Sequence, residues 1–291
     1  MFKLKNEVSV KFLAEHFGVS KSNFYKWLKH REASTVRLTS KKEICNEIKS
    51  VFTASKETYG SPRVYAELKT KGVLISENTV AKYMREMGLD ARLKKKYRVM
   101  TTDSNHSDPI APRLFKTEDE HCLPTKPGMV LAGDITYLKL SKHNHVYLAV
   151  VLDLYNREVV GWSMSRSMDS RIVMDALHGA IKNTSPDAEV IFHSDRGVQY
   201  ASIAYRNFLK NQKIIPSMSR KGNCYDNAYV ESFFSSFKKE WVYRQNPKTE
   251  DAMKACVFNY IETWYNKRRR HSSLDYMSPL DYRVKQQNRT S

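Results

Sequence analysis

Cysteine is scarce in this sequence, with four residues at positions 45, 122, 224 and 256 and no C-x-x-C pair. This spacing argues against a zinc ribbon and against a disulfide framework. We therefore expect the chain to reside in a reducing compartment. Long apolar runs are also missing: the longest lies around residues 146–152, and residues 1–10 hold no stretch that could serve as a signal peptide. We therefore expect a cytoplasmic protein without a membrane segment.

Acidic residues are outnumbered, because 31 Asp and Glu face 49 Lys and Arg and leave a formal charge of +18. An excess of this size predicts a polyanionic partner, with nucleic acid as the first candidate. A merely well-solvated basic surface is the alternative, but the excess persists through both halves of the chain. With 291 residues, 41% of them apolar, the chain can build two or three folded domains.

The beginning of the chain has the layout of two short helices joined by a turn. Apolar residues repeat at helical spacing within residues 10–17 and again within 24–28. Between them, Gly18 suits a left-handed turn and Ser20 can cap the second helix. We assign this helix-turn-helix to residues 1–35. In it, the side chains of Lys21, Asn23 and Lys26 would face outward toward a DNA groove. Small helical hairpins with no DNA role share the same pattern.

A second helical unit is predicted over residues 36–98. Ser61 and Pro62 form a good helix opening, and Ser76 can cap a segment whose apolar residues, from Val80 to Met87, lie on one face. The run RLKKKYR at 92–98 suits a phosphate backbone, although it would also suit a solvated helix end. Its candidate DNA contacts are Lys94, Lys95 and Lys96. Residues 99–127 are rich in proline and polar residues, which predicts a linker.

Beyond the linker, a core over residues 128–245 shows the pattern of strands followed by alternating helices and strands. Strands are expected at 130–140, 145–155 and 157–165, then at 189–194 and 213–218, with helices from about 169, at 200–212 and at 226–241. This order predicts an α/β fold in which a mixed sheet is covered by helices. Helices at 248–266 and 279–287 form a basic extension over residues 246–291, whose KRRRH run offers Arg268 and Arg269 as DNA contacts.

Three acidic residues of the core are candidates for one catalytic site. Asp134 falls in the middle of an apolar strand, where a carboxylate is costly unless something positive compensates it. Asp195 follows a strand directly, at the end where open α/β sheets gather ligands. Glu231 lies on a predicted helix whose apolar residues form a buried stripe at positions 230, 233, 234, 237 and 241. Glu231 and Lys238 lie together on the face next to this stripe. Read singly, each carboxylate is an ordinary strand, turn or surface residue.

Three carboxylates that converge on one cleft are what two magnesium ions require, because hard cations take oxygen ligands. Two such ions, roughly 3.5 to 4 Å apart, can activate an attacking oxygen and stabilise a leaving one in an in-line displacement. No His or Cys ligand is needed. His193 and His271 can assist, or they can equally be packed or DNA-facing histidines.

Four segments carry a resemblance to a known family: GDITY (133–137), HSDRGVQY (193–200), SMSRKGNCYDNAYVESFFSSFKKE (217–240) and YIETWYNKRRRHSSLDYMSP (260–279). They resemble the bacterial insertion-sequence transposases with an integrase-type catalytic core, most closely the second-frame subunit of elements that encode their transposase in two overlapping frames. Thirty-five residues lie between Asp195 and Glu231, the spacing behind this family's D,D(35)E name. Residues 59–89 resemble the helix-turn-helix that precedes the core. Leu131 stands where the family usually has Trp, a packing change.

The resemblance implies an RNase H-like fold in which Asp134, Asp195 and Glu231 match the metal-binding triad. Lys238 matches a basic residue thought to contact DNA. The implied reaction uses two magnesium ions, for which Mn2+ can substitute: water exposes a 3′ hydroxyl at the element end, and that hydroxyl attacks another strand. Neither a covalent protein intermediate nor a nucleotide cofactor is implied. The implied partners are double-stranded DNA of element ends and target, further copies of the chain, and the first-frame protein by fusion, in a nucleoid-associated complex.

Three other functions remain open at this stage. A simple magnesium nuclease of the same fold would share the triad but need neither the helical units nor the basic tail. A non-catalytic DNA-binding regulator would be favoured by a broken triad, and the triad is intact. A retroviral-type integrase would be expected to bring a zinc-binding His-His-Cys-Cys module, and His16, His30 and Cys45 do not make one.

Overall fold

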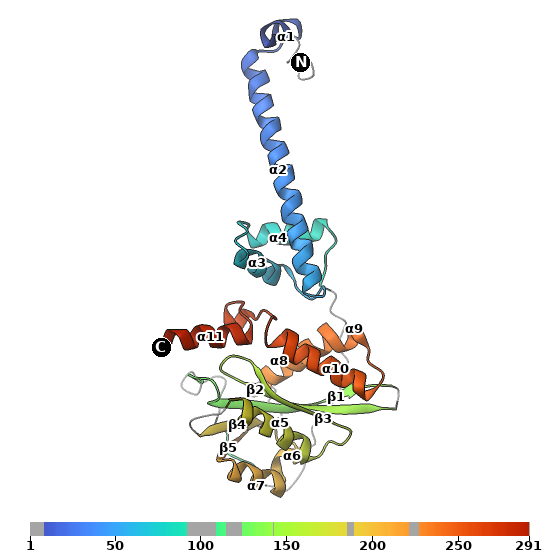
Figure 1. Ribbon diagram of the computed structural model, residues 1–291, viewed down its shortest axis with the longest axis vertical. Coiled ribbons are helices and arrows are strands. Elements are labelled where there is room, and N and C mark those ends of the chain that lie inside the picture. Colours follow the sequence, from blue (N-terminus) through green and yellow to red (C-terminus); the bar gives the residue numbers. More distant parts are fainter. Residues whose placement is uncertain are drawn as a thin grey trace. The chain divides into compact units, whose positions relative to one another are not determined.

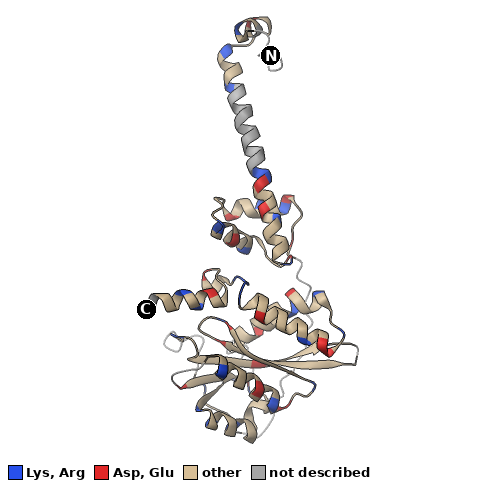
Figure 2. Ribbon diagram, viewed as in Figure 1, with Lys and Arg blue, Asp and Glu red and all other residues tan. Residues whose placement is uncertain are grey.

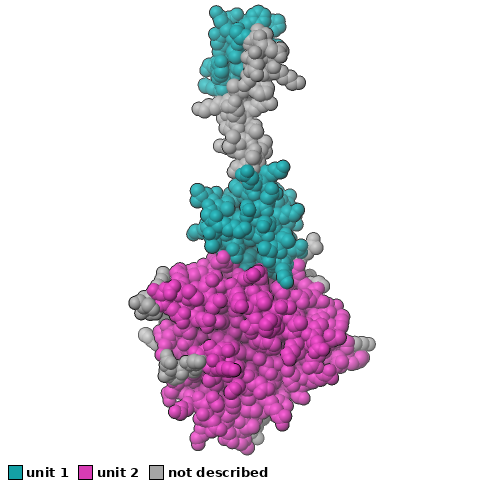
Figure 3. Space-filling view, viewed as in Figure 1, with its two compact units in different colours: residues 1–92 teal, residues 93–291 magenta. Residues whose placement is uncertain are grey.

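The computed structural model describes residues 9–91, 109–114, 124–141, 143–184, 189–220 and 227–290. The chain divides into two compact units, residues 1–92 and 93–291, which are coloured separately in Figure 3. Among the described residues, no helix is long and apolar enough to cross a membrane.

The first unit contains four helices: α1 (Val10–His16), α2 (Lys21–Ala54), α3 (Ser61–Thr70) and α4 (Glu77–Glu86). The predicted turn between α1 and α2 is present, with Gly18 at φ +61° and the Ser20 hydroxyl accepting the N–H of Asn23. Phe17 of the predicted apolar face does not pack inside, since its side chain is 51% exposed. Helix α2 is continuous through residue 35, so the predicted division of this region into two domains falls within one helix and stays a prediction.

The second half of the first unit is a three-helix arrangement formed by the end of α2 with α3 and α4. Ser76 caps α4 as predicted, because its hydroxyl accepts the N–H of Thr79. The apolar face of α4 packs inward through Val80 and Met84. The small core of this arrangement consists of Ile48, Val51, Phe52, Tyr59, Val64, Leu68, Val80 and Met84.

The second unit is built on a five-stranded sheet with the strand order β3-β2-β1-β4-β5. The strands are β1 (Val130–Lys139), β2 (His145–Asp153), β3 (Val159–Ser165), β4 (Val190–Ser194) and β5 (Ile214–Met218). The first three form an antiparallel meander, and β4 and β5 run parallel to β1. This confirms the mixed sheet predicted from the sequence.

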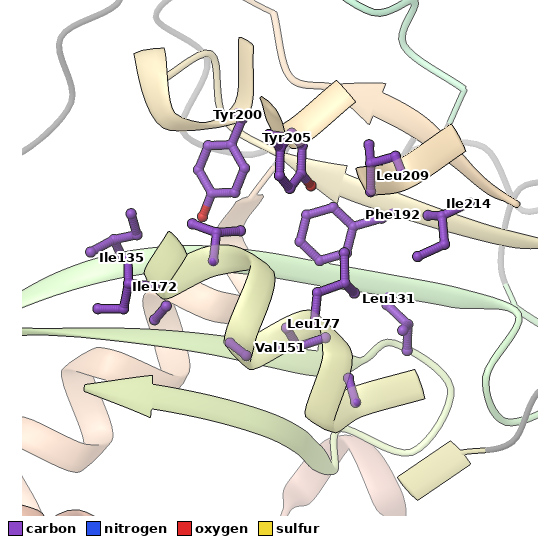
Figure 4. Packing of buried hydrophobic residues seen from close by; sticks show 14 of the residues in the cluster. Leu131, Ile135, Val151, Ile172, Leu177, Phe192, Tyr200, Tyr205, Leu209 and Ile214 are labelled. Carbon is purple, nitrogen blue, oxygen red and sulfur yellow. The ribbon is translucent and has the colours of Figure 1, made fainter. Parts of the chain in front are cut away.

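Helices cover both faces of the sheet (Figure 1). Helices α5 (Ser170–Thr184), α6 (Val198–Ala201) and α7 (Ile203–Asn211) lie on one face. The other carries α8 (Ala228–Phe237), the π-helix η4 (Lys238–Val242), α9 (Tyr243–Gln245), α10 (Glu250–Phe258) and the π-helix η5 (Asn259–Tyr265). The 3-10 helix η6 (Ser272–Leu274) and α11 (Pro279–Thr290) follow. The core on the α5 face gathers the rings of Phe192, Tyr200 and Tyr205 against β-branched and leucine side chains (Figure 4).

Helix α5 approaches β3 so closely at Gly161 that no side chain fits there. A Cβ atom at Gly161 would lie 2.1 Å from the carbonyl oxygen of Ala176. We therefore expect Gly161→Ala to lower the free energy of unfolding by about 3 kcal/mol, because overpacking forces the backbone apart.

Gly179, in the same helix, is the matched control because a methyl group added there would have nothing within 4 Å of it. Gly179→Ala should raise the free energy of unfolding by about 0.5–1 kcal/mol, since alanine is the better helix former. Urea unfolding of both variants measures the two shifts. Equal stability of the two variants would contradict the close packing of α5 on β3.

Both edges of the sheet are occupied by other parts of the chain. At the β3 edge, the Asn266 side chain pairs with the backbone of Val159: its Oδ1 accepts the N–H and its Nδ2 donates to the carbonyl, each at 2.9 Å. At the β5 edge, the N–H of Met218 donates to the carbonyl of Pro112 at 3.4 Å, and the N–H of Leu114 donates to the Ser217 hydroxyl at 2.9 Å. Part of the predicted linker therefore docks on the sheet.

The segment after residue 246 is tied to the core as well. The Asn156 side-chain amide donates to the carbonyl of Pro279 at 3.4 Å, and Arg283 forms a 3.0 Å ion pair with Glu158. The predicted C-terminal extension thus packs within the same compact unit as the sheet.

Candidate active site

The topology brings Asp134 and Asp195 to one end of the sheet. Strands β1 and β4 are parallel neighbours, and Ala132 lies opposite His193. Two residues further along each strand, the register places Asp134 level with Asp195. The sequence predicted the place of Asp195, at the carboxyl end of a strand, whereas the level of Asp134 in the middle of β1 is set by the pairing of β1 with β4.

Local hydrogen bonds orient both aspartates. The Oδ1 of Asp134 accepts the N–H of Ile135 at 2.7 Å. The Oδ1 of Asp195 accepts the N–H of Gly197 at 2.9 Å, at the point where α6 begins. These backbone donors restrict the rotation of each carboxylate before anything binds.

Glu231 reaches the same region from α8, which packs against β1. The predicted apolar stripe is confirmed, since every member is at most 6% exposed: Val230, Phe233, Phe234, Phe237 and Trp241. Glu231 lies beside this stripe and is exposed, and Lys238, seven residues later, is half-buried where α8 gives way to the π-helix η4.

The four charged groups act on one another. Burial raises the pKa of Asp134 well above its usual value, and the charges of Asp195 and Glu231 raise it further, against the Ile135 N–H and Lys238, which lower it. Burial lowers the pKa of Lys238 to about 8, and the charge of Asp134 opposes that change. A partly buried carboxylate with two like charges near it is a place where a cation is favoured.

The donor set fits a hard divalent ion, because all three acidic groups offer carboxylate oxygen. They are not already gathered around a point: among the residues that the structure describes, no group of three or more His, Cys, Asp or Glu could hold a metal ion as it stands. The fit is therefore one of chemistry and proximity.

The two histidines that sequence reasoning considered are both packed. His193 is completely buried, between the hydroxyls of Ser217 and Ser219. The ring of His271 packs edge-on against Tyr265, with 4.9 Å between ring centroids.

The predicted DNA contacts differ in how exposed the structure shows them to be. Lys21, Asn23, Lys26 and Arg268 are exposed, so their role stays a prediction. Lys94, Lys95 and Lys96 lie outside the described residues. Arg269 needs correction: it is 4% exposed and bonded to Glu240, so its position does not suit the predicted DNA contact.

The pair formed by Arg269 and Glu240 is a buried network that the sequence reasoning missed. Arg269 Nη2 lies 2.6 Å from Glu240 Oε1, and Arg269 Nε donates to Glu240 Oε2 at 2.8 Å. The Tyr260 hydroxyl donates to the same Oε2 at 3.1 Å, and Ser236 accepts from Arg269 Nη2. The one available signal was that Glu240 follows Phe237 by three residues, which places it beside the apolar stripe.

In Figure 2, positions of Lys and Arg are interspersed with positions of Asp and Glu along the helices of the first unit. In the first unit, Lys41 pairs with Glu86 at 2.8 Å and Lys71 with Glu47 at 2.9 Å. The excess of positive charge in the whole sequence therefore does not produce a face of one sign on this part of the first unit.

Comparison with known proteins gives three family matches. Models described as "Integrase core domain" match residues 124–224 and 212–279, and one described as "HTH-like domain" matches residues 40–97. The transposase InsF of insertion sequence IS3A from Escherichia coli (strain K12) is 38% identical over 283 residues, which is 97% of this chain and 96% of that protein. The insertion element IS600 uncharacterized 31 kDa protein of Shigella sonnei is 36% identical over 273 residues, covering 94% of this chain and 98% of that protein.

Solved structures with a similar arrangement include two viral integrase cores. The HTLV-2 integrase catalytic core domain in complex with magnesium has a TM-score of 0.43 at 16% identity, covering 55% of this chain and 98% of that one. The catalytic core domain of BIV integrase has a TM-score of 0.41 at 16% identity, covering 56% and 98%.

Proposed function

The chain belongs to the IS3 family of insertion-sequence transposases, and on this basis we propose that Asp134, Asp195 and Glu231 hold two magnesium ions during DNA strand cleavage and joining. The family and the integrase core place the protein among enzymes that cut DNA and transfer it. The observation that carries the finer proposal is geometric: the β1–β4 register brings Asp134 level with Asp195, and α8, which carries Glu231, packs against β1.

In the proposed site, Asp134 and Asp195 would be ligands from the sheet and Glu231 a ligand from α8. Bound magnesium supplies positive charge that activates the attacking oxygen and stabilises the leaving oxygen. The chain itself contributes orientation, because the Gly197 N–H fixes the Asp195 carboxylate and the Ile135 N–H fixes that of Asp134. Lys238, beside Asp134, would bind a DNA phosphate near the scissile bond.

The proposed reaction consists of two displacements at phosphorus. A water first attacks the phosphodiester at the element end: a new P–O bond forms, the bond to the 3′ oxygen breaks, and the element keeps a 3′ hydroxyl. That hydroxyl then attacks a phosphodiester of the second strand, whose own 3′ oxygen leaves. The number of phosphodiester bonds is conserved in the joining step, so no nucleotide cofactor is required. Mn2+ would replace magnesium because it accepts the same oxygen ligands.

Incubating the full chain with labelled duplexes that carry candidate element ends tests the proposal. We expect joined strands with magnesium or Mn2+ and none with a chelator. Hydrolysis without joining would favour a simple nuclease, and DNA binding without either would favour a regulator. Both results would overturn the proposed strand transfer.

Lys238→Ala should weaken duplex binding and reduce its salt dependence. The slope of log K against log salt concentration is negative, and removing one phosphate contact should make it less steep by about 0.9. Fluorescence anisotropy at several salt concentrations measures this slope. Lys210→Ala is the matched control, because Lys210 is an exposed lysine of α7, on the other face of the sheet. A slope unchanged in both variants would assign Lys238 to the solvated surface.

The partners follow from the proposed reaction. Duplex DNA of element end and target is the substrate, and joining two ends in one event calls for more than one copy of the chain on DNA. Because the sequence resembles second-frame subunits, we also propose fusion to the first-frame protein as the source of full end recognition. Binding to the chromosome in this way would place the complex at the nucleoid.

A further inference from the structure

Ser219, directly after β5, bonds the backbone of Ser194 and the side chain of Arg196, the two neighbours of Asp195. Its N–H donates to the carbonyl of Ser194 at 2.9 Å, and its hydroxyl donates to the same carbonyl at 3.1 Å. Its own carbonyl accepts Arg196 Nε at 2.7 Å. The residues immediately before and after Asp195 are therefore both bonded to Ser219, which is itself 4% exposed.

His193 completes this arrangement from inside the sheet. Its Nε2 lies 3.1 Å from the Ser219 hydroxyl oxygen and its Nδ1 lies 2.9 Å from the Ser217 hydroxyl oxygen. Because the single hydroxyl hydrogen of Ser219 is directed at Ser194, the Nε2 atom must be the donor in its contact. The Ser217 oxygen accepts the N–H of Leu114, which leaves its hydrogen for Nδ1. The tautomer with hydrogen on Nε2 satisfies these four contacts.

We propose that Ser219 and His193 are positioning residues for Asp195, which together hold its carboxylate where the divalent ion binds. The inference rests on the proposed function, since it concerns the same site. Two hydrogen bonds from Ser219 fix the backbone carbonyl of Ser194, directly before Asp195, and the Gly197 N–H fixes the Asp195 side chain. Partners of this kind orient ligand carboxylates, and their loss typically lowers metal affinity or activity about 10–100-fold.

Ser219→Ala removes the hydroxyl that bonds both Ser194 and His193 while leaving the N–H and carbonyl of residue 219 in place. We expect the affinity for Mn2+, measured by calorimetry on the full chain, to fall about 10-fold or more. The rate of strand joining should fall by a similar factor at saturating duplex. The KM for duplex should stay within about twofold, because the carboxylate acts on the reacting bond and not on the remainder of the DNA.

Ser278→Ala is the matched control. Ser278 is also completely buried in the second unit, and its hydroxyl accepts the N–H of Asp281, away from the contacts around Asp195. Both variants should lose comparable thermal stability, but only Ser219→Ala should lose Mn2+ affinity. Equal Mn2+ affinity in the two variants would reduce Ser219 to a structural residue and overturn the proposal.

A measurement on the unaltered protein covers the case in which Ser219→Ala does not fold. The ring 15N chemical shifts of His193 distinguish the two tautomers, and we expect hydrogen on Nε2 only. Hydrogen on Nδ1, or on both nitrogens, would contradict the proposed chain of contacts. The same assay distinguishes this proposal from the proposed function. If only the positioning role is wrong, Ser219→Ala joins strands like the unaltered chain. If the proposed function is wrong, the unaltered chain itself joins no strands.

Discussion

Asp195→Asn is expected to abolish both strand cleavage and strand joining while leaving duplex binding nearly unchanged. The amide keeps the size of the side chain and an oxygen for the Gly197 N–H, but it removes the negative charge that would bind the divalent ion. Loss of charge stabilisation worth several kcal/mol corresponds to a rate decrease of about 1,000-fold or more. Gel analysis of labelled duplex ends in magnesium measures both steps.

Asp175→Asn is the matched control for this variant. Asp175 is exposed on α5, on the opposite face of the sheet from α8, so its loss should leave both steps at the level of the unaltered chain. Joining by Asp195→Asn in magnesium, at more than a few per cent of that level, would show that the assignment of the triad is wrong.

Arg269→Ala is expected to lower the free energy of unfolding of the second unit by about 3–5 kcal/mol, because it leaves a buried carboxylate without its cation. Glu240 and Arg269 are both at most 4% exposed, and two hydrogen bonds join them. The Tyr260 hydroxyl would remain bonded to Glu240 Oε2, but a neutral hydroxyl does not replace the charge of the guanidinium. Chemical denaturation followed by far-UV circular dichroism measures the loss.

Arg268→Ala separates stability from DNA binding, since Arg268 is the exposed neighbour of Arg269. Its unfolding free energy should stay within about 0.5 kcal/mol of the unaltered chain. Its duplex affinity should fall if the predicted DNA contact is correct. An Arg269→Ala variant with normal stability but weakened DNA binding would restore the original prediction for Arg269 and contradict the structural role.

Much of the sheet was predictable because its signals are local. Short apolar runs such as residues 130–139 and the polar turns between the first three strands are local signs of strands. The stripe from Val230 to Trp241 has the spacing of a helix, and its burial follows. The position of Asp195 at the carboxyl end of a strand was also predictable, but the register that brings Asp134, in the middle of β1, level with it is given by the structure.

What the sequence could not show depends on partners distant along the chain. In the sequence, Arg269 cannot be distinguished from the other cations of KRRRH. Only the structure shows that it donates a hydrogen bond to Glu240, 29 residues earlier. The π-helical turns η4 and η5 differ from α-helix in hydrogen bonding while keeping a helical pattern of apolar residues, so spacing alone does not detect them. The contacts of residues 112–114 with β5 were equally hidden, because a proline-rich segment predicts a linker whether or not it docks.

The occupied margins of the sheet limit how copies of this transposase can meet. A bare outer strand is a template for another chain, and natural proteins avoid that hazard by covering it. Here Asn266 occupies the backbone of Val159 at one edge and Pro112 that of Met218 at the other, so neither strand is open over its full length for pairing with a second copy. An isolated catalytic core that began after Leu114 or stopped before Asn266 would expose these strands and would be prone to aggregate.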